Sequence, residues 1–280
     1  MAKKDSLKQQ KFMSFMFRGK EIFKPLNTGH IDERVSCIRE YVANIYFYSK
    51  DGYTIMIDAG YNYDRLAEKM RWIDIRPESI NEIIVTHQDT DHVGAIEVDS
   101  QGLFKTAKIY VGRVENEYLE GRVRRKVYWG LYKLPQVHIE NDKTLIEDGE
   151  IFYIHDIKIE AFLVPGHTWG HLVYLIDDAY LFTGDTIWFG ADGGYAFLNT
   201  LAEDRKLQSV SLKRLEEKLR KRNPSLKIIT GHTGWTDDFD FAFRHVDEIC
   251  NALRRKPKVQ DPKAPYDGFD ESGDTEDKTR

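Results

Sequence analysis

The stretch Thr86-His87-Gln88-Asp89-Thr90-Asp91-His92 places four side chains of metal-ligand type within six residues, directly after the β-branched run 82–86. Such a run predicts a strand that stops at His87. In an extended loop, residues 87, 89 and 91 project to one side and His92 approaches from another. Imidazole and carboxylate groups suit zinc, iron and manganese. The stretch therefore predicts a metal-binding loop, with ordinary caps and turns as the alternative.

The same arrangement recurs three times along the chain. The hydrophobic runs 162–164, 180–182 and 227–229 each predict a strand, and each leads into a short turn with glycine directly before a potential ligand. Glycine lets the backbone turn closely around a bound ion. Four strands that each end in a potential ligand are harder to explain as independent caps. The three further segments are Pro165-Gly166-His167, Thr183-Gly184-Asp185 and Thr230-Gly231-His232.

The remaining pattern mixes strands and helices. Runs 41–48 and 53–57, separated by a turn-like Ser49-Lys50-Asp51-Gly52, predict a hairpin, and 63–72 predicts a helix. Segment 208–222 has apolar side chains about one helical turn apart at Val210, Leu212, Leu215 and Leu219, which predicts an amphipathic helix packed on a sheet. No regular βαβ alternation occurs. The pattern favours an α/β sandwich with helices outside two packed sheets.

Length and composition limit the number of domains that the chain can form. With 280 residues and 41% hydrophobic residues, we expect one catalytic domain over 23–257, preceded by an N-terminal extension, 1–22. The acidic segment 258–280 lacks periodicity and is expected to be a disordered tail. No apolar run approaches a membrane span, and 13–17 is too short for a signal peptide. Two cysteines, Cys37 and Cys250, give no disulfide framework, so we expect a cytoplasmic protein.

The charge distribution excludes one class of partner. The net charge is −5, of which residues 260–280, with seven acidic and three basic side chains, supply −4. The rest is nearly neutral and has no basic footprint for nucleic acid. We expect a small-molecule substrate, no nucleic acid and no membrane, and leave the oligomeric state open.

Taken together, the ordered motifs resemble those of the metallo-β-lactamase superfamily: His-x-His-x-Asp-His, then Gly-His, Gly-Asp and Gly-His. Segments 43–46 and 55–60 also resemble the opening hairpin of that family. The resemblance runs from about residue 27 to residue 250. It implies an αββα sandwich, with two packed mixed sheets and helices outside, and it implies metal-dependent hydrolysis.

The resemblance also implies a division of ligands between two divalent metal ions, which we expect to be zinc, iron or manganese. One set is His87, Asp89 and His167. The other is Asp91, His92 and His232, and Asp185 bridges the two ions. The chain departs from the family at Asp89, where histidine is usual. A carboxylate is a harder ligand than imidazole, so iron and manganese become candidates beside zinc. From sequence, we expect Asp89→His to keep two ions and shift the preference towards zinc.

The expected chemistry is attack by metal-bound hydroxide on an ester, thioester, lactone or phosphoester, with Asp91 orienting the hydroxide and moving a proton. Two alternatives stay open. A carboxylate at position 89 also resembles the flavodiiron branch, a di-iron redox class, although the C-terminal tail has no Gly-rich phosphate loop for a flavin domain. The other alternative is a non-catalytic metal-binding protein, against which the apparently complete ligand set argues.

Substrate choice is less well defined. Segments 165–168 and 184–186 resemble the glyoxalase II and thioesterase branch. Quorum-signal lactonases have a tyrosine where this chain has Trp188, although Tyr195 lies in the following loop. His171 is expected either to support a ligand or face the substrate, or else to be a hydrogen-bonded packing residue. The segment 113–133, which interleaves basic and aromatic residues, is either a substrate lid or a solvated helix face.

Overall fold

The first sheet has eight strands and carries the first ligand motif at one of its ends. Its order is β18-β1-β2-β3-β4-β5-β6-β9, antiparallel from β18 to β4 and parallel from β4 to β9. The computed structural model describes residues 23, 25–40, 42–61, 63–97, 104–222, 225–248 and 267–268. The strands are β1 (Gly29–His30), β2 (Val35–Glu40), β3 (Ala43–Lys50), β4 (Tyr53–Ile57), β5 (Glu82–Val85), β6 (Lys108–Gly112), β9 (Lys143–Ile146) and β18 (Asp267–Gly268).

The second sheet has six strands in the order β10-β11-β12-β13-β16-β17, antiparallel except for the parallel pair β13 and β16. Two hairpins lie outside both sheets: β7 (Lys126–Val127) with β8 (Tyr132–Lys133), and β14 (Ile187–Phe189) with β15 (Gly194–Ala196). The six strands are β10 (Ile151–Ile154), β11 (Ile157–Leu163), β12 (Leu172–Ile176), β13 (Tyr180–Phe182), β16 (Lys227–Thr230) and β17 (Gly234–Thr236).

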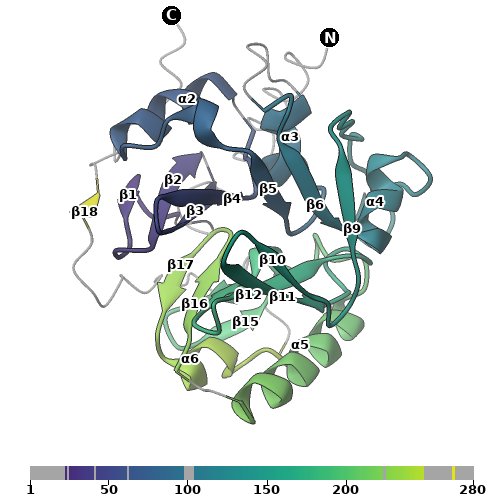
Figure 1. The fold of residues 1–280 in the computed structure, drawn as a ribbon. Coiled ribbons are helices and arrows are strands. Elements are labelled where there is room, and N and C mark those ends of the chain that lie inside the picture. The colour runs from purple at the N-terminus through teal and green to yellow at the C-terminus, as the bar shows by residue number, and fades with distance from the viewer. Residues whose placement is uncertain are drawn as a thin grey trace, which may run out of the picture.

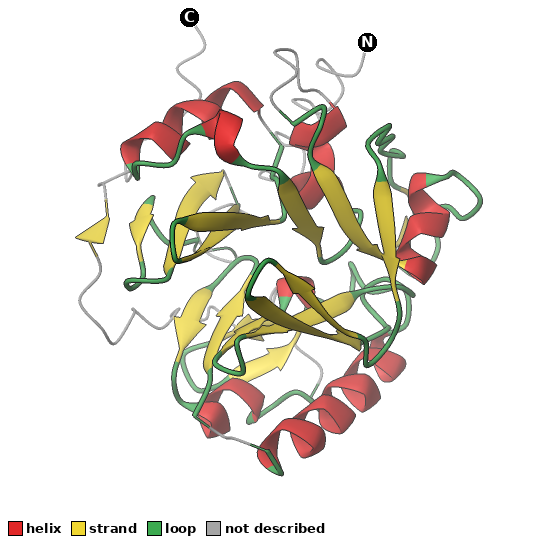
Figure 2. Cartoon of the chain, in the orientation of Figure 1, coloured by secondary structure: helices red, strands yellow, loops and turns green. Residues whose placement is uncertain are grey.

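Helices cover the outer face of each sheet (Figures 1 and 2). On the first sheet lie α2 (Tyr63–Trp72), α3 (Thr90–Glu97) and α4 (Arg113–Leu119), and on the second lie α5 (Arg205–Arg220) and α6 (Phe239–Phe243). Short 3-10 turns occur at η2 (Pro77–Ser79) and η3 (Gly184–Thr186). The predicted αββα sandwich is confirmed.

Alternation along β5 explains the layering. Ile83 and Val85 point into the core beneath α2 and α3, whereas Ile84 points into the core between the two sheets. All three side chains are fully buried, as expected for a parallel strand covered on both faces. The sheets are also tied by hydrogen bonds at the end that carries the ligands: Tyr46 Oη donates to the carbonyl of Thr230, and Tyr174 Oη donates to that of Val85.

The hairpin and the helix over 63–72 are confirmed, and two local predictions are wrong. The extended loop ends at Asp89, because α3 begins at Thr90 and places Asp91 and His92 in its first turn. In α5, Val210 is 47% exposed, whereas Leu212, Leu215 and Leu219 are buried, so the packed face is narrower than the spacing suggested.

Several sequence predictions fall outside the described residues. These are the extension 1–22, Cys250 and, except for β18, the tail 258–280. Cys37 is buried, and its Sγ donates to the carbonyl of Asn27. Among the helices that the structure describes, none is long and apolar enough to cross a membrane.

Candidate metal centre

The ends of four strands place potential ligands in one buried cluster. His87 follows β5, His167 follows β11, Asp185 lies in η3 after β13, and His232 follows β16. Asp89 lies in the loop before α3, which contributes Asp91 and His92. No side chain of the cluster is more than 11% exposed. The structure thus brings together all seven residues that the sequence singled out.

One group of donors comprises Asp91, His92, Asp185 and His232, each offering an atom within 4.8 Å of the others. His92 Nε2 lies 3.2 Å from Asp185 Oδ1 and 3.9 Å from Asp91 Oδ2. His232 Nε2 lies 3.0 Å from Asp185 Oδ2 and 3.5 Å from Asp91 Oδ2. Two imidazoles and two carboxylates at these separations could hold one metal ion.

A second group shares Asp185 and adds His87 and His167, again within 4.8 Å of one another. Asp185 Oδ2 lies 3.8 Å from His87 Nε2 and 3.7 Å from His167 Nε2. Asp89 is not a member of this mutual group, but its Oδ2 lies 3.7 Å from His87 Nε2 and 3.2 Å from His167 Nε2. The two groups of donors therefore adjoin at the shared carboxylate of Asp185.

Three imidazoles are oriented through their Nδ1 atoms. His92 Nδ1 lies 2.8 Å from Asp58 Oδ2, His232 Nδ1 lies 2.5 Å from the carbonyl of Val42, and His87 Nδ1 lies 3.0 Å from Thr86 Oγ1. An acceptor at Nδ1 fixes the proton there and leaves the Nε2 lone pair free for a metal ion. Each Nε2 faces the cluster.

Asp58 is a candidate functional residue that the sequence analysis treated only as part of the opening hairpin. Besides His92, it accepts hydrogen bonds from Thr86 N and Thr86 Oγ1, both at 2.8 Å. It follows β4, the parallel neighbour of β5, so its side chain lies beside the start of the metal loop. A carboxylate directly after a strand that neighbours a ligand-bearing strand was the available signal.

Arg125 is the second missed residue. It lies between α4 and β7, its side chain is 1% exposed, and its guanidinium forms a two-point ion pair with Asp89. Its basic neighbours Arg122 and Arg124 are exposed. The pattern of mixed charges in 113–133 did not distinguish the one buried arginine.

The chemistry of the donor set fits divalent cations. Among the described residues, His87 Nε2, His92 Nε2 and Asp185 Oδ1 are buried without a hydrogen-bond partner, although such atoms are normally satisfied. Burial lowers the pKa of His92, yet the carboxylates of Asp185, Asp58 and Asp91 outweigh it and hold that pKa well above 6.5. The cluster therefore attracts positive charge, and its unsatisfied atoms point at one another.

Asp185 is held by close backbone packing. Its N–H donates to His171 Nε2 at 3.1 Å, so His171 supports this potential ligand as well as stacking on His87. Gly184 has φ +50°, and a side chain there would meet Thr86 and His171. A Cβ at Gly231 would lie 2.6 Å from Asp185 Oδ1. Both glycines allow the strand ends to converge.

The other candidate residues lie elsewhere. Trp188 is buried in an apolar cluster with Phe197 and Leu201, and the Tyr195 hydroxyl donates to Asp192. Segment 113–133 is a short helix followed by a hairpin, not one helix face.

Two aromatic rings contact the cluster itself. Phe23 and Phe197 lie against the His232 ring, with centroids 4.6 and 5.3 Å away.

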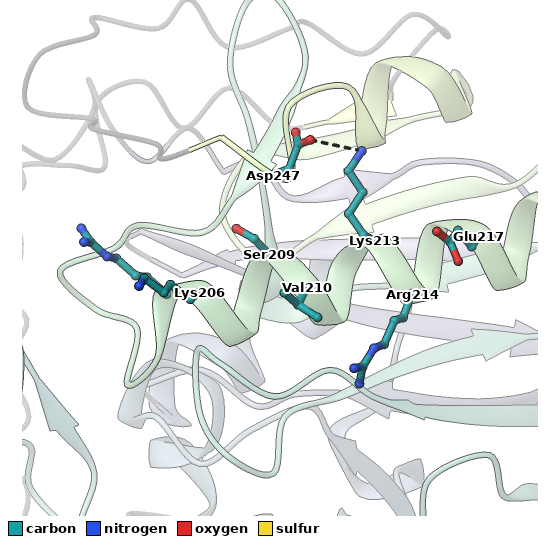
Figure 3. A pocket seen from close by; sticks show the side chains of 8 residues that line it. Lys206, Ser209, Val210, Lys213, Arg214, Glu217 and Asp247 are labelled. Carbon is teal, nitrogen blue, oxygen red and sulfur yellow. Dashed lines mark ion pairs between the residues drawn. The ribbon is translucent and has the colours of Figure 1, made fainter.

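A separate hollow of about 540 Å³ lies on the outer face of α5 (Figure 3). Basic side chains of the helix, including Lys206, Lys213 and Arg214, line it, and Lys213 Nζ lies 3.8 Å from Asp247 Oδ2. No potential ligand of the cluster described above lines this hollow. The candidate site is therefore assigned to the strand ends.

Comparison with known proteins shows which family the chain matches. Residues 38–232 match the family model described as the metallo-beta-lactamase superfamily. The chain is 26% identical to a probable polyketide biosynthesis zinc-dependent hydrolase, BaeB, from Bacillus velezensis, over 64% of this chain and 67% of that protein. It is 25% identical to the hydroxyacylglutathione hydrolase GloC of Haemophilus influenzae, over 65% and 80%.

Other relatives are covered less completely. A hydroxyacylglutathione hydrolase from Buchnera aphidicola is 28% identical over 50% of this chain but only 44% of its own length.

Among solved structures, a B3 metallo-β-lactamase with an active-site glutamic acid aligns with a TM-score of 0.58 at 16% identity, covering 80% of this chain and 88% of that one. At that identity the likeness concerns the fold alone.

Proposed function

The chain belongs to the metallo-β-lactamase superfamily, and from that premise we propose that it is a metal-dependent hydrolase with a dinuclear centre. The observation that carries the proposal is the pair of adjacent donor groups that share Asp185. The buried, unsatisfied Nε2 atoms of His87 and His92 support it, because a bound cation would satisfy each of them.

In this proposal, His87, Asp89 and His167 hold the first ion, and Asp91, His92 and His232 hold the second. Asp185 would be shared by both, since its Oδ1 faces His92 and its Oδ2 lies 3.0 Å from His232 Nε2 and 3.7–3.8 Å from the histidines of the first position. Two bound divalent ions would lower the pKa of a water between them and polarise the oxygen of a substrate carbonyl or phosphoryl group.

Asp91 is the proposed proton-transfer residue. Burial raises its pKa more than the nearby His92 and His232 lower it, and the charges of Asp185 and Asp89 act in the same direction as burial. A bound cation would reverse that shift, so the role proposed for Asp91 rests on its position. Its position in the first turn of α3 would let it orient the attacking water and pass the proton to the leaving group.

The proposed substrates are thioesters first, with esters, lactones and phosphoesters as the wider class. Support for thioesters comes from relatives named hydroxyacylglutathione hydrolase, although the chain spans about half the length of most of these. Zinc is proposed because BaeB is named a zinc-dependent hydrolase, with iron and manganese as competitors.

The test is hydrolysis by purified protein loaded in turn with zinc, iron and manganese, on a panel of thioesters, esters, lactones, phosphodiesters and β-lactams. We expect thioester turnover by the wild type and its loss in Asp185→Asn. The control Asp178→Asn changes an exposed carboxylate in the turn between β12 and β13 and should leave turnover intact. Turnover that persists in Asp185→Asn contradicts the proposed site.

A redox function would give a different result. Oxygen consumption by the iron-loaded protein with an external reductant, without hydrolysis of any ester-type substrate, would support the flavodiiron-like alternative instead. Two bound ions with neither activity would support a non-catalytic metal-binding protein.

A further inference from the structure

We infer that Arg125 is a positioning residue for the first metal position: it neutralises Asp89 and aims one oxygen of that carboxylate at the space between His87 and His167. The Asp89 and Arg125 pair would thereby act as a single neutral ligand, as an imidazole does. This inference rests on the dinuclear centre proposed above.

Arg125 is fixed by hydrogen bonds that all three of its guanidinium nitrogens donate. Nε donates to Asp89 Oδ1 at 2.9 Å, and Nη2 lies 3.2 Å from Asp89 Oδ2. Nη2 also donates to the carbonyl of Leu201 at 2.5 Å, and Nη1 donates to that of Lys126 at 3.1 Å. A planar guanidinium held at each nitrogen has one orientation available, so the carboxylate paired with it is held too.

The two oxygens of Asp89 have different surroundings. Oδ1 accepts from Arg125 Nε and from Gln88 Nε2, the latter at 2.8 Å. Oδ2 accepts from Arg125 Nη2, at 3.2 Å, and faces His87 Nε2 at 3.7 Å and His167 Nε2 at 3.2 Å. Ligands about 2.0–2.1 Å from a tetrahedral ion lie roughly 3.3–3.4 Å from one another. The Oδ2 atom is therefore placed as one ligand of the first position.

Charge explains why Asp89 needs this partner. Asp185 already brings one negative charge to both positions, and Asp91 and Asp58 bring two more to the second. An unpaired Asp89 would add a fourth buried carboxylate. Conversely, Arg125 without Asp89 would keep only the more weakly interacting Glu203 and Glu115, and its guanidinium, 3.2 Å from His167 Nε2, would compete with a metal ion for the lone pair.

The ion pair of Asp89 and Arg125 leads to a prediction that would not follow from either residue alone. In Asp89→His, the guanidinium has lost its counter-ion and repels the first metal ion. Removing the guanidinium as well, in the double variant Asp89→His with Arg125→Met, leaves a neutral imidazole and an apolar side chain. The first position should then bind metal again. Rescue by a second substitution is an outcome that simple damage to the fold does not produce.

The experiment measures zinc binding to chelator-treated protein by titration calorimetry, with elemental analysis of the product. We expect two zinc ions for wild type, one for Asp89→His with affinity for the other weakened on the order of a hundredfold or more, and two for the double variant. The matched control combines Asp89→His with Arg124→Met, which removes an exposed arginine one residue away. It should behave like Asp89→His alone.

The outcomes separate the two proposals. Two ions bound tightly by Asp89→His, absence of rescue in the double variant, or equal rescue by Arg124→Met would each overturn the role of Arg125. If Asp89→His does not fold but the double variant folds and binds two ions, the inference stands, because the unpaired buried cation is then the cause. A wild type that binds one zinc ion at saturation would instead overturn the dinuclear centre itself.

Discussion

Replacement of Asp58 by asparagine tests how far the second metal position depends on a residue that need not touch the metal. Asp58 accepts three hydrogen bonds, from Thr86 N, Thr86 Oγ1 and His92 Nδ1, each 2.8 Å long. Asparagine has the same shape and tolerates the φ of +60° at this position. It loses the charge, and its NH₂ group would face donors.

The magnitude follows from the contact to His92. A hydrogen bond to a charged group contributes about 1.5–3 kcal/mol, and loss of a carboxylate that orients a ligating histidine costs roughly 10–100-fold in metal affinity. These ranges agree, because about 1.4 kcal/mol corresponds to tenfold. We therefore expect the weaker of two zinc dissociation constants to rise by roughly 10–100-fold in Asp58→Asn.

The assay is competition for zinc against a chromophoric chelator, with the urea midpoint of the metal-free protein measured in parallel. The control Asp51→Asn makes the same chemical change at an exposed position, also with positive φ, in the turn between β3 and β4. Unchanged zinc affinity in Asp58→Asn, with folding intact, would refute the idea that Asp58 orients His92. An equal loss in Asp51→Asn would point to a general effect of charge.

Three further predictions concern other parts of the site. Elemental analysis should find two ions per chain, and His92→Ala or His167→Ala should remove at least one ion together with activity; retained activity would show the site to be misassigned. Burial raises the pKa of Glu115 to about 8 from 4.5, so the folded chain keeps a proton that the unfolded chain loses. The free energy of unfolding should therefore fall as pH rises from about 4.5 to 8. The urea midpoints at pH 5 and pH 8 should differ less in Glu115→Gln than in the wild type. A Cβ at Gly170 would lie 2.1 Å from Glu115 N, so Gly170→Ala should destabilise the fold by about 1–3 kcal/mol or more in urea, and an unchanged midpoint would contradict the close approach.

The ordered motifs were sufficient to predict the αββα sandwich and the seven clustered residues, through the family that they resemble. Strand periodicity and the glycines before His167, Asp185 and His232 are local signals, and they predicted only strands that end in potential ligands. Asp58 and Arg125 were not predicted in their roles. Their importance depends on pairs 34 and 36 residues apart, with His92 and Asp89, which no local pattern specifies. A buried arginine is also uncommon, so exposure was the reasonable expectation for all the basic residues of 113–133.

The structure changes one expectation drawn from sequence. From the sequence alone, which does not show the contact with Arg125, Asp89→His removes one negative charge and should keep both ions. With the guanidinium buried against Asp89, the same substitution leaves a positive charge behind. The start of α3 at Thr90 is a second case, because Thr90-Asp91-His92 has the composition of a loop and packing of the following residues against the first sheet decides the helix.

The convergence of ligands from both sheets also has a consequence for how the protein holds together. His92 lies on a helix packed against the first sheet and His232 follows a strand of the second, 140 positions further along the chain. An ion shared between them would act as a removable cross-link between two halves that otherwise meet through side-chain packing and a few hydrogen bonds. Because such a site exists only in the folded chain, free metal at a hundred times its dissociation constant would add about 2.7 kcal/mol per site to stability. The lifetime of the protein would then follow the supply of metal in its surroundings, independently of any substrate.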